Sequence, residues 1–107
     1  MNDKFIEELF SLLKMRAKTT SNKSYTSKLI NNKDLLAKKI GEESSELIID
    51  LIKQNKKGII KESAVLLYHL LVVWLYSNVD PKDIWDELYK RQAQSGIEEK
   101  KNRVEEM

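Results

Sequence analysis

Apolar side chains recur along most of this chain at the three- and four-residue spacing of amphipathic helices, and no segment alternates polar and apolar residues for long. The pattern predicts an all-α protein with four helices, over about residues 2–17, 32–54, 59–76 and 81–92. Between the first two helices lies the polar stretch "KTTSNKSYTSKLINNK", residues 18–33. We expect an ordered loop of unusual length there, and long loops in compact domains are often functional.

Capping residues predict where the helices begin. The stretch from Asn32 to Asp34 supplies N-cap oxygens for the second helix, and Asp80 followed by Pro81 is a strong start signal for the fourth. Beyond residue 91 the apolar stripe ends, which predicts one domain over residues 1–92 and a charged tail or frayed helix over residues 93–107. The side chains that the fourth helix is expected to bury are Ile84, Trp85, Leu88 and Tyr89.

The predicted third helix is unusual because it is apolar on every side from Ala64 onward, in "AVLLYHLLVVWLY". Such a helix needs cover all round, and three amphipathic neighbours in a chain this short provide too little. A helical bundle completed by dimerisation solves the problem, so a homodimer is expected. The apolar run is shorter than the roughly 20 residues of a membrane-spanning helix. This favours a core helix and no membrane partner.

Composition narrows the function further. The chain has 107 residues, enough for one domain, and 19 basic side chains nearly balance 17 acidic ones, for a net charge of +2. This balance gives no reason to invoke nucleic acid or an anionic membrane as a partner. The chain has no cysteine, which excludes disulfides and thiolate metal sites. Its first residues lack the apolar stretch of a secretory signal, so a cytoplasmic location is expected.

Acidic residues cluster in "KKIGEESSELIID", residues 38–50. At about 100° per residue, four carboxylates share one arc that borders the apolar side of the helix, with Lys39 in the same arc. The stripe can be the solvated face of a helix rich in Lys and Glu. It can also hold a hard cation such as Mg²⁺, which binds carboxylate oxygens, water and substrate phosphates. The four carboxylates belong to Glu42, Glu43, Glu46 and Asp50.

Glu62 lies on the same helix face as Val65, Leu66 and His69, so its carboxylate should point toward the interior. A buried glutamate needs a partner. That partner is either a lysine in a salt bridge or a metal ion shared with the acidic stripe. His69 lies in an apolar helix, which is more typical of a hydrogen-bonded core histidine than of a catalyst.

Four motifs together resemble those of the phosphoribosyl-ATP pyrophosphatases. They are "SYTSKL" (24–29), "KKIGEESSE" (38–46), "ESAVLLYHLLV" (62–72) and "ELYKRQ" (87–92). The wider MazG-like all-α NTP pyrophosphatases share the acidic helices but not the "SYT" loop. The resemblance implies a four-helix MazG-like fold completed by dimerisation. It also implies Mg²⁺-dependent hydrolysis of the α–β bond of phosphoribosyl-ATP to phosphoribosyl-AMP and pyrophosphate, the second step of histidine biosynthesis.

The resemblance also assigns roles to single residues. In the superfamily an E-x-x-E pair binds the metal, and here it matches Glu43 and Glu46, with Glu42 before them. Glu62 matches the first residue of a second pair, E-x-x-D. Val65 stands where that pair has aspartate and cannot bind a metal. Asp50, on the acidic arc, is a candidate replacement.

These residues indicate a mechanism based on charge neutralisation and positioning. Glu42, Glu43, Glu46 and Glu62 would hold Mg²⁺ against the phosphate oxygens, and one of them would accept the proton of an attacking water. Lys39 would either contact a phosphate or offset the acids. The loop offers four residues that either donate hydrogen bonds to phosphate or ribose, or cap and anchor the loop: Ser24, Tyr25, Thr26 and Lys28.

Two rival functions stay open at this point. A general nucleoside triphosphate pyrophosphatase would use the same scaffold, because fold does not settle substrate, although the "SYT" loop favours the histidine pathway. A helical dimer that has lost catalysis and serves as an interaction module is the other, motivated by Val65. Pyrophosphate release from phosphoribosyl-ATP and from simple nucleotides separates these possibilities.

Overall fold

The computed structural model describes residues 4–18 and 24–93. Within these ranges every regular element is a helix: α1 (Phe5–Ala17), α2 (Tyr25–Ile30), α3 (Lys33–Ile52), α4 (Lys56–Tyr76) and α5 (Pro81–Gln92). The all-α class predicted from the hydrophobic spacing is therefore confirmed. The predicted tail falls almost wholly in residues 94–107, which lie outside the described part of the chain.

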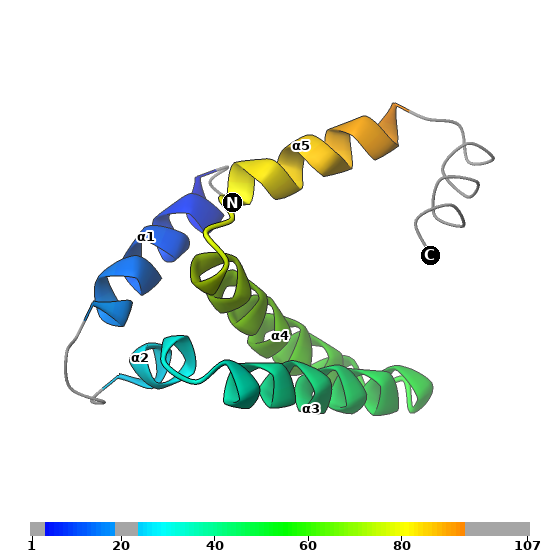
Figure 1. Ribbon diagram of the computed structural model, residues 1–107. Helices are drawn as coiled ribbons and strands as arrows, with labels where there is room; N and C mark the ends of the chain where they lie inside the picture. The colour runs from blue at the N-terminus through cyan, green and yellow to red at the C-terminus, as the bar shows by residue number, and fades with distance from the viewer. Residues whose placement is uncertain (1–3, 19–23, 94–107) are drawn as a thin grey trace.

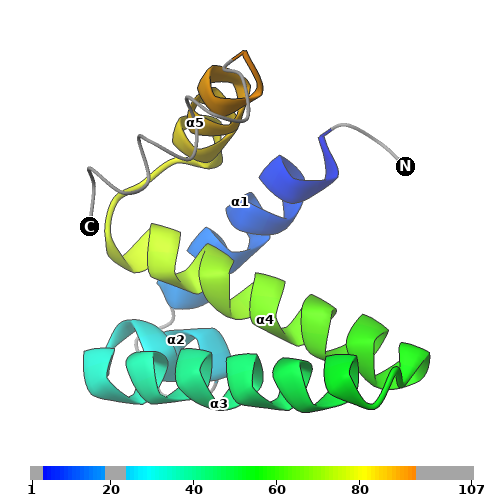
Figure 2. The same ribbon diagram turned by 90° about the vertical axis from the view of Figure 1, so that its right-hand side faces the viewer.

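The long helices α3 and α4 form an antiparallel hairpin, and α1 and α2 pack at the end of it where α3 begins and α4 ends (Figures 1 and 2). At this end a compact cluster of apolar side chains is withdrawn from solvent. It also draws in half-buried neighbours such as Ile6, Tyr68 and Trp74. The fully buried members are Phe10, Leu13, Leu29, Leu36, Leu71 and Val72.

Side-chain caps explain where α3, α4 and α5 begin. Asn32 accepts a hydrogen bond from the Leu35 amide at 3.1 Å, and Asn55 accepts one from the Gly58 amide at 3.3 Å. Because of the Asn55 cap, α4 begins at Lys56, a few residues before the predicted start. The start of α5 is confirmed: Asp80 forms a reciprocal capping box, and the following proline needs no amide partner.

The polar stretch between α1 and α3 is not simply a long loop, because it contains the short helix α2. The Ser24 side chain caps this helix by accepting a hydrogen bond from the Ser27 amide at 3.0 Å. Thr26, Ser27 and Leu29 are all buried. Packing of Leu29 into the core and the serine cap outweigh a composition typical of loops. The described residues thus hold five helices instead of the expected four.

Helix α5 buries less than expected. Ile84 and Trp85 are half-buried, but Leu88 is 55% exposed and Tyr89 is 70% exposed. The reason is geometric: the first turns of α5 pack on α1, and the rest of α5 extends away from the bundle (Figure 1). Trp85 makes the contact: its indole N–H donates to Glu7 Oε1 at 2.9 Å, and its ring meets Trp74 edge to face.

Helix α4 is the one described helix that is long and apolar enough to cross a membrane by length and composition alone, with a mean hydropathy of 1.6. It nevertheless buries Glu62 and His69 and runs alongside α3. Apolar side chains on its outer side are left uncovered in a single chain, with Ile60 71% exposed and Leu67 37% exposed. Because α4 is apolar on all sides but has neighbouring helices on only some of them, part of its apolar surface stays exposed.

Candidate active site

Three carboxylates meet between α3 and α4. Glu43 and Glu46 are three residues apart on α3 and so share a face of that helix, and Glu62 faces them from α4. One oxygen from each of the three lies within 4.8 Å of the others. Glu43 is half-buried, Glu46 is exposed and Glu62 is buried. The structure thus brings together three of the four glutamates that the sequence singled out.

Glu62 is the member that most needs a partner. Its side chain is 7% exposed, and its buried Oε2 atom has no hydrogen-bond partner among the described residues. A hydrogen bond shared with Glu43 raises the pKa of the Glu62 carboxyl above its ordinary value, and burial raises the pKa further. Buried, unsatisfied carboxylate oxygens are unfavourable. The three carboxylates are therefore arranged to bind a common ligand that would give the Glu62 oxygen a partner.

The donor set indicates which kind of ligand fits. It consists of carboxylate oxygens only, with no histidine or cysteine among the three. Such oxygens suit a hard divalent cation, and Mg²⁺ commonly binds one or two carboxylates while keeping water and substrate phosphates as its other ligands. A cation here would relieve both the mutual repulsion of the carboxylates and the unsatisfied Glu62 oxygen.

Glu42 lies beside this group and not within it. Its carboxylate pairs with Lys39 Nζ at 3.4 Å and with Lys38 Nζ at 3.8 Å. The hydrogen bond from Lys39 to Glu42 raises the pKa of the Lys39 ammonium. The acidic stripe is therefore divided into a cation-paired part at Glu42 and the part that faces Glu62.

Asp50 lies outside the three-carboxylate group, at the turn between α3 and α4. Its Oδ1 accepts a hydrogen bond from the Asn55 side chain at 3.3 Å, and its carboxylate sits where a side chain on Gly58 would lie. The absence of a Cβ at Gly58 is what allows this close approach. Asp50 thus has a structural partner, and its role as a metal ligand stays a prediction.

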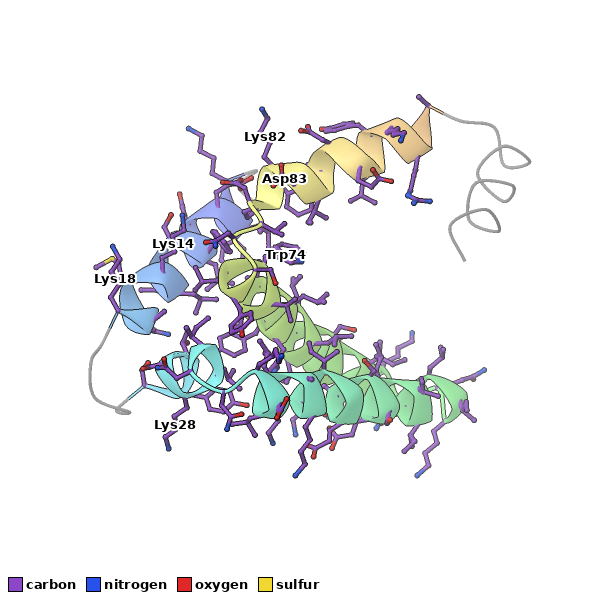
Figure 3. All side chains as sticks on the ribbon, in the orientation of Figure 1. Lys14, Lys18, Lys28, Trp74, Lys82 and Asp83 are labelled. Atoms are coloured by element: carbon purple, nitrogen blue, oxygen red, sulfur yellow. The ribbon has the colours of Figure 1, made fainter. Side chains whose placement is uncertain are left out.

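The α2 residues divide between anchoring and exposure. Ser24 caps α2 and donates to the Arg16 carbonyl at 3.2 Å, while Thr26 is buried and hydrogen-bonded to the Tyr68 hydroxyl at 2.7 Å. Lys28 is exposed and extends from the side of α2 that faces away from α4 (Figure 3). Of the four candidates, Tyr25 combines an exposed side chain with a position near the acids, because the charges of Lys39, Glu43 and Glu42 all act on its hydroxyl.

Sequence reasoning did not predict the hydrogen bond between the Tyr25 hydroxyl and His69 Nε2 at 3.0 Å. The two residues are 44 positions apart, and no spacing rule connects a polar loop to a helix that distant. The available signal was chemical, since a buried histidine requires polar partners. His69 is 3% exposed and has two, the second being the Val65 carbonyl at 2.8 Å from Nδ1.

Comparison with known proteins places this geometry in context. Residues 6–92 match the family described as phosphoribosyl-ATP pyrophosphohydrolase. The match includes all five helices almost completely, and with them the three carboxylates and the contact between Tyr25 and His69.

Individual relatives are similar over most of their length. The phosphoribosyl-ATP pyrophosphatase of Paramagnetospirillum magneticum is 40% identical over 104 residues, which is 96% of this chain and 95% of the relative. That of Rhizobium meliloti is 39% identical, covering 96% of this chain and 97% of the relative. That of Sulfolobus acidocaldarius is 40% identical, covering 85% and 97%.

Proposed function

We propose that this chain, which belongs to the phosphoribosyl-ATP pyrophosphohydrolase family, hydrolyses phosphoribosyl-ATP to phosphoribosyl-AMP and pyrophosphate in the second step of histidine biosynthesis. It is a hydrolase acting on a phosphoric anhydride, as its relatives' names indicate. The observation that carries the proposal is the meeting of Glu43, Glu46 and Glu62, with a buried Glu62 oxygen that has no partner among the described residues. A divalent cation that accompanies a triphosphate substrate would offset the charge of the three carboxylates and give the Glu62 oxygen a partner.

The three carboxylates would hold Mg²⁺. When bound, Mg²⁺ supplies positive charge that offsets the charge of the triphosphate. Glu62 is fixed by its burial in α4 and so orients the group. Glu46 is exposed and can accept a proton from water on the open side of the site. Lys39, held beside Glu42, adds a cation at the edge of the site where a phosphate oxygen could be bound.

A homodimer is part of the proposal. Large apolar side chains lie exposed along the half of the α3–α4 hairpin that α1 and α2 do not cover, and a second copy of the chain would bury them. The exposed apolar side chains on this surface are Ile48, Ile49, Leu51, Ile52 and Ile60.

We assign the protein to the cytoplasm, where its proposed substrate phosphoribosyl-ATP would be found.

The test is pyrophosphate release from phosphoribosyl-ATP by the wild type and by Glu46→Gln. The substitution keeps the shape of the side chain but removes a charged ligand, so turnover should fall by at least about 100-fold. Glu8→Gln, an exposed glutamate of α1, is the matched control and should retain activity. Circular dichroism checks that each variant is folded.

The wild type also decides between substrates. Faster release of pyrophosphate from ATP than from phosphoribosyl-ATP would favour the general nucleoside triphosphate pyrophosphatase. No release from either substrate, by folded protein with Mg²⁺, would favour the non-catalytic module.

A further inference from the structure

The hydrogen bond between Tyr25 and His69 links α2 to α4 next to the acidic residues. The arrangement is well fixed, because the Tyr25 ring stacks on Tyr68 at 6.1 Å with an interplanar angle of 18°. His69 meets both tyrosine rings edge-on, at 5.8 Å and 5.1 Å. Tyr25 is nevertheless 44% exposed, so part of its side chain is open to a ligand.

The hydrogen-bond partners determine where the protons lie. His69 Nδ1 faces the Val65 carbonyl oxygen at 2.8 Å, and a carbonyl oxygen only accepts, so Nδ1 carries the proton. In a neutral imidazole Nε2 is then an acceptor. The partner of Nε2 at 3.0 Å is the Tyr25 hydroxyl, which must therefore donate its single proton to His69.

Tyr25 keeps that proton at neutral pH. Burial raises the pKa of the Tyr25 phenol, with smaller upward contributions from Tyr68, Glu43 and Glu42. The nearby Lys39 ammonium acts in the opposite direction but does not reverse the shift. The Tyr25 oxygen thus offers only lone pairs to any further partner, and it lies near Glu43 and Glu42, whose charges act on it.

We propose that His69 fixes Tyr25 as a hydrogen-bond acceptor, so that Tyr25 binds a sugar hydroxyl of phosphoribosyl-ATP and not its phosphate oxygens. This inference rests on the function proposed above. A deprotonated polyphosphate has acceptors only and cannot pair with an oxygen whose proton is already donated. Tyr25 is then a substrate-binding residue that distinguishes the sugar from the phosphate chain, and His69 is a positioning residue that acts through it.

The proton placement can be tested without substrate. In ¹⁵N-edited NMR spectra of the wild-type protein, the neutral His69 ring should carry its proton on Nδ1 and have an unprotonated, hydrogen-bonded Nε2. The chain contains one histidine, so the assignment is direct. Tyr25→Phe should shift the Nε2 resonance toward that of a free imidazole, whereas Tyr76→Phe, at the exposed end of α4, should not. A proton on Nε2 in the wild type would overturn the proposal.

Kinetics test the sugar contact. Tyr25→Phe removes one acceptor, so KM for phosphoribosyl-ATP should rise about 3- to 10-fold, while inhibition by inorganic triphosphate with Mg²⁺ should be unchanged. Equal weakening of substrate and triphosphate would show that Tyr25 contacts phosphate, and no change in either would show that it contacts neither. Tyr76→Phe is again the control.

For His69→Leu, the binding of triphosphate and the binding of substrate should change in opposite directions. Removing the acceptor frees the Tyr25 proton, so inorganic triphosphate should inhibit more strongly while KM for phosphoribosyl-ATP rises. A purely structural role for His69 would weaken both. If His69→Leu does not fold, the NMR and Tyr25→Phe experiments still decide. A wild type that binds triphosphate but never turns over phosphoribosyl-ATP contradicts the proposed function, while the position of the histidine proton is still read independently.

Discussion

The two ends of the α3–α4 hairpin have similar apolar side chains but very different cover. Where α3 begins and α4 ends, α1 and α2 close over Leu36, Leu71 and Val72, which are at most 4% exposed. Toward the turn, Ile52 and Ile60 are 76% and 71% exposed. The three carboxylates lie between these two ends. Hydrophobic pattern alone therefore does not distinguish the apolar side chains that are buried within one chain from those that a single chain leaves exposed.

The covered end should dominate the stability of the fold. Leu71→Ala creates a cavity at a fully buried position and should lower the free energy of unfolding by about 2–5 kcal/mol. Met15→Ala, 71% exposed on α1, should change it by less than about 0.5 kcal/mol. Urea unfolding at one fixed protein concentration measures both. Similar effects for the two variants would contradict the division into a covered core and an open surface.

The open end should control assembly. Ile52→Asp places a charge on the surface that we propose a second copy buries, and it should weaken the dimer by at least about 100-fold in Kd. Sedimentation equilibrium measures the mass of the wild type and the variant. Met15→Asp is the matched control on the opposite part of the molecule. A variant that keeps the wild-type mass would show that the interface lies elsewhere.

Between the two ends, Glu62 should affect stability in opposite directions with and without metal. Because the pKa of Glu62 is raised in the folded state, ionised Glu62 is less favourable there than in the unfolded chain. The protonated Glu62 carboxyl therefore contributes stability at low pH, and this contribution is lost as the pH rises through the raised pKa. At pH 7 without metal, Glu62→Gln should melt at a higher temperature than the wild type. With Mg²⁺, the wild type should gain stability and the variant should not.

Thermal melts in EDTA and in Mg²⁺ test this reversal directly. A variant that melts below the wild type in EDTA would contradict it. Glu8→Gln serves as the control, because it removes a charge at an exposed position on α1 and should respond equally in both buffers.

The smallest effect is expected at the turn of the hairpin. Asp50→Ala removes the hydrogen bond to Asn55 and should cost about 1 kcal/mol of stability. If Asp50 serves the turn alone, the Mg²⁺ titration of the variant will match that of the wild type. A weaker titration would instead assign Asp50 to the metal, as the acidic arc of α3 suggested.

Much of the fold follows from local rules in the sequence. The apolar spacing predicts the long helices, and capping by Asn32 and Asp80 locates the starts of α3 and α5. The interior position of Glu62 also follows from its helix face. These features depend on contacts within one or two helical turns, which is the range that a single sequence encodes directly.

What the sequence did not predict depends on the packing of distant elements. Helix α2 is polar in composition, yet Thr26 and Ser27 are buried because Leu29 anchors the segment in the core. Leu88 and Tyr89 have helical spacing, yet α5 leaves the bundle before they can pack. The pairing of Tyr25 with His69 depends on the angle between α2 and α4. No local rule provides such angles.

The junction of α1, α4 and α5 has an optical consequence. The chain contains two tryptophans, and they meet there with ring centroids 6.3 Å apart at 87°, while Trp85 is tethered to Glu7. All indole emission therefore originates from one spot, labelled by Trp74 in Figure 3. Undocking of α5 would separate this pair of fluorophores and change its ultraviolet spectrum, with no dye attached.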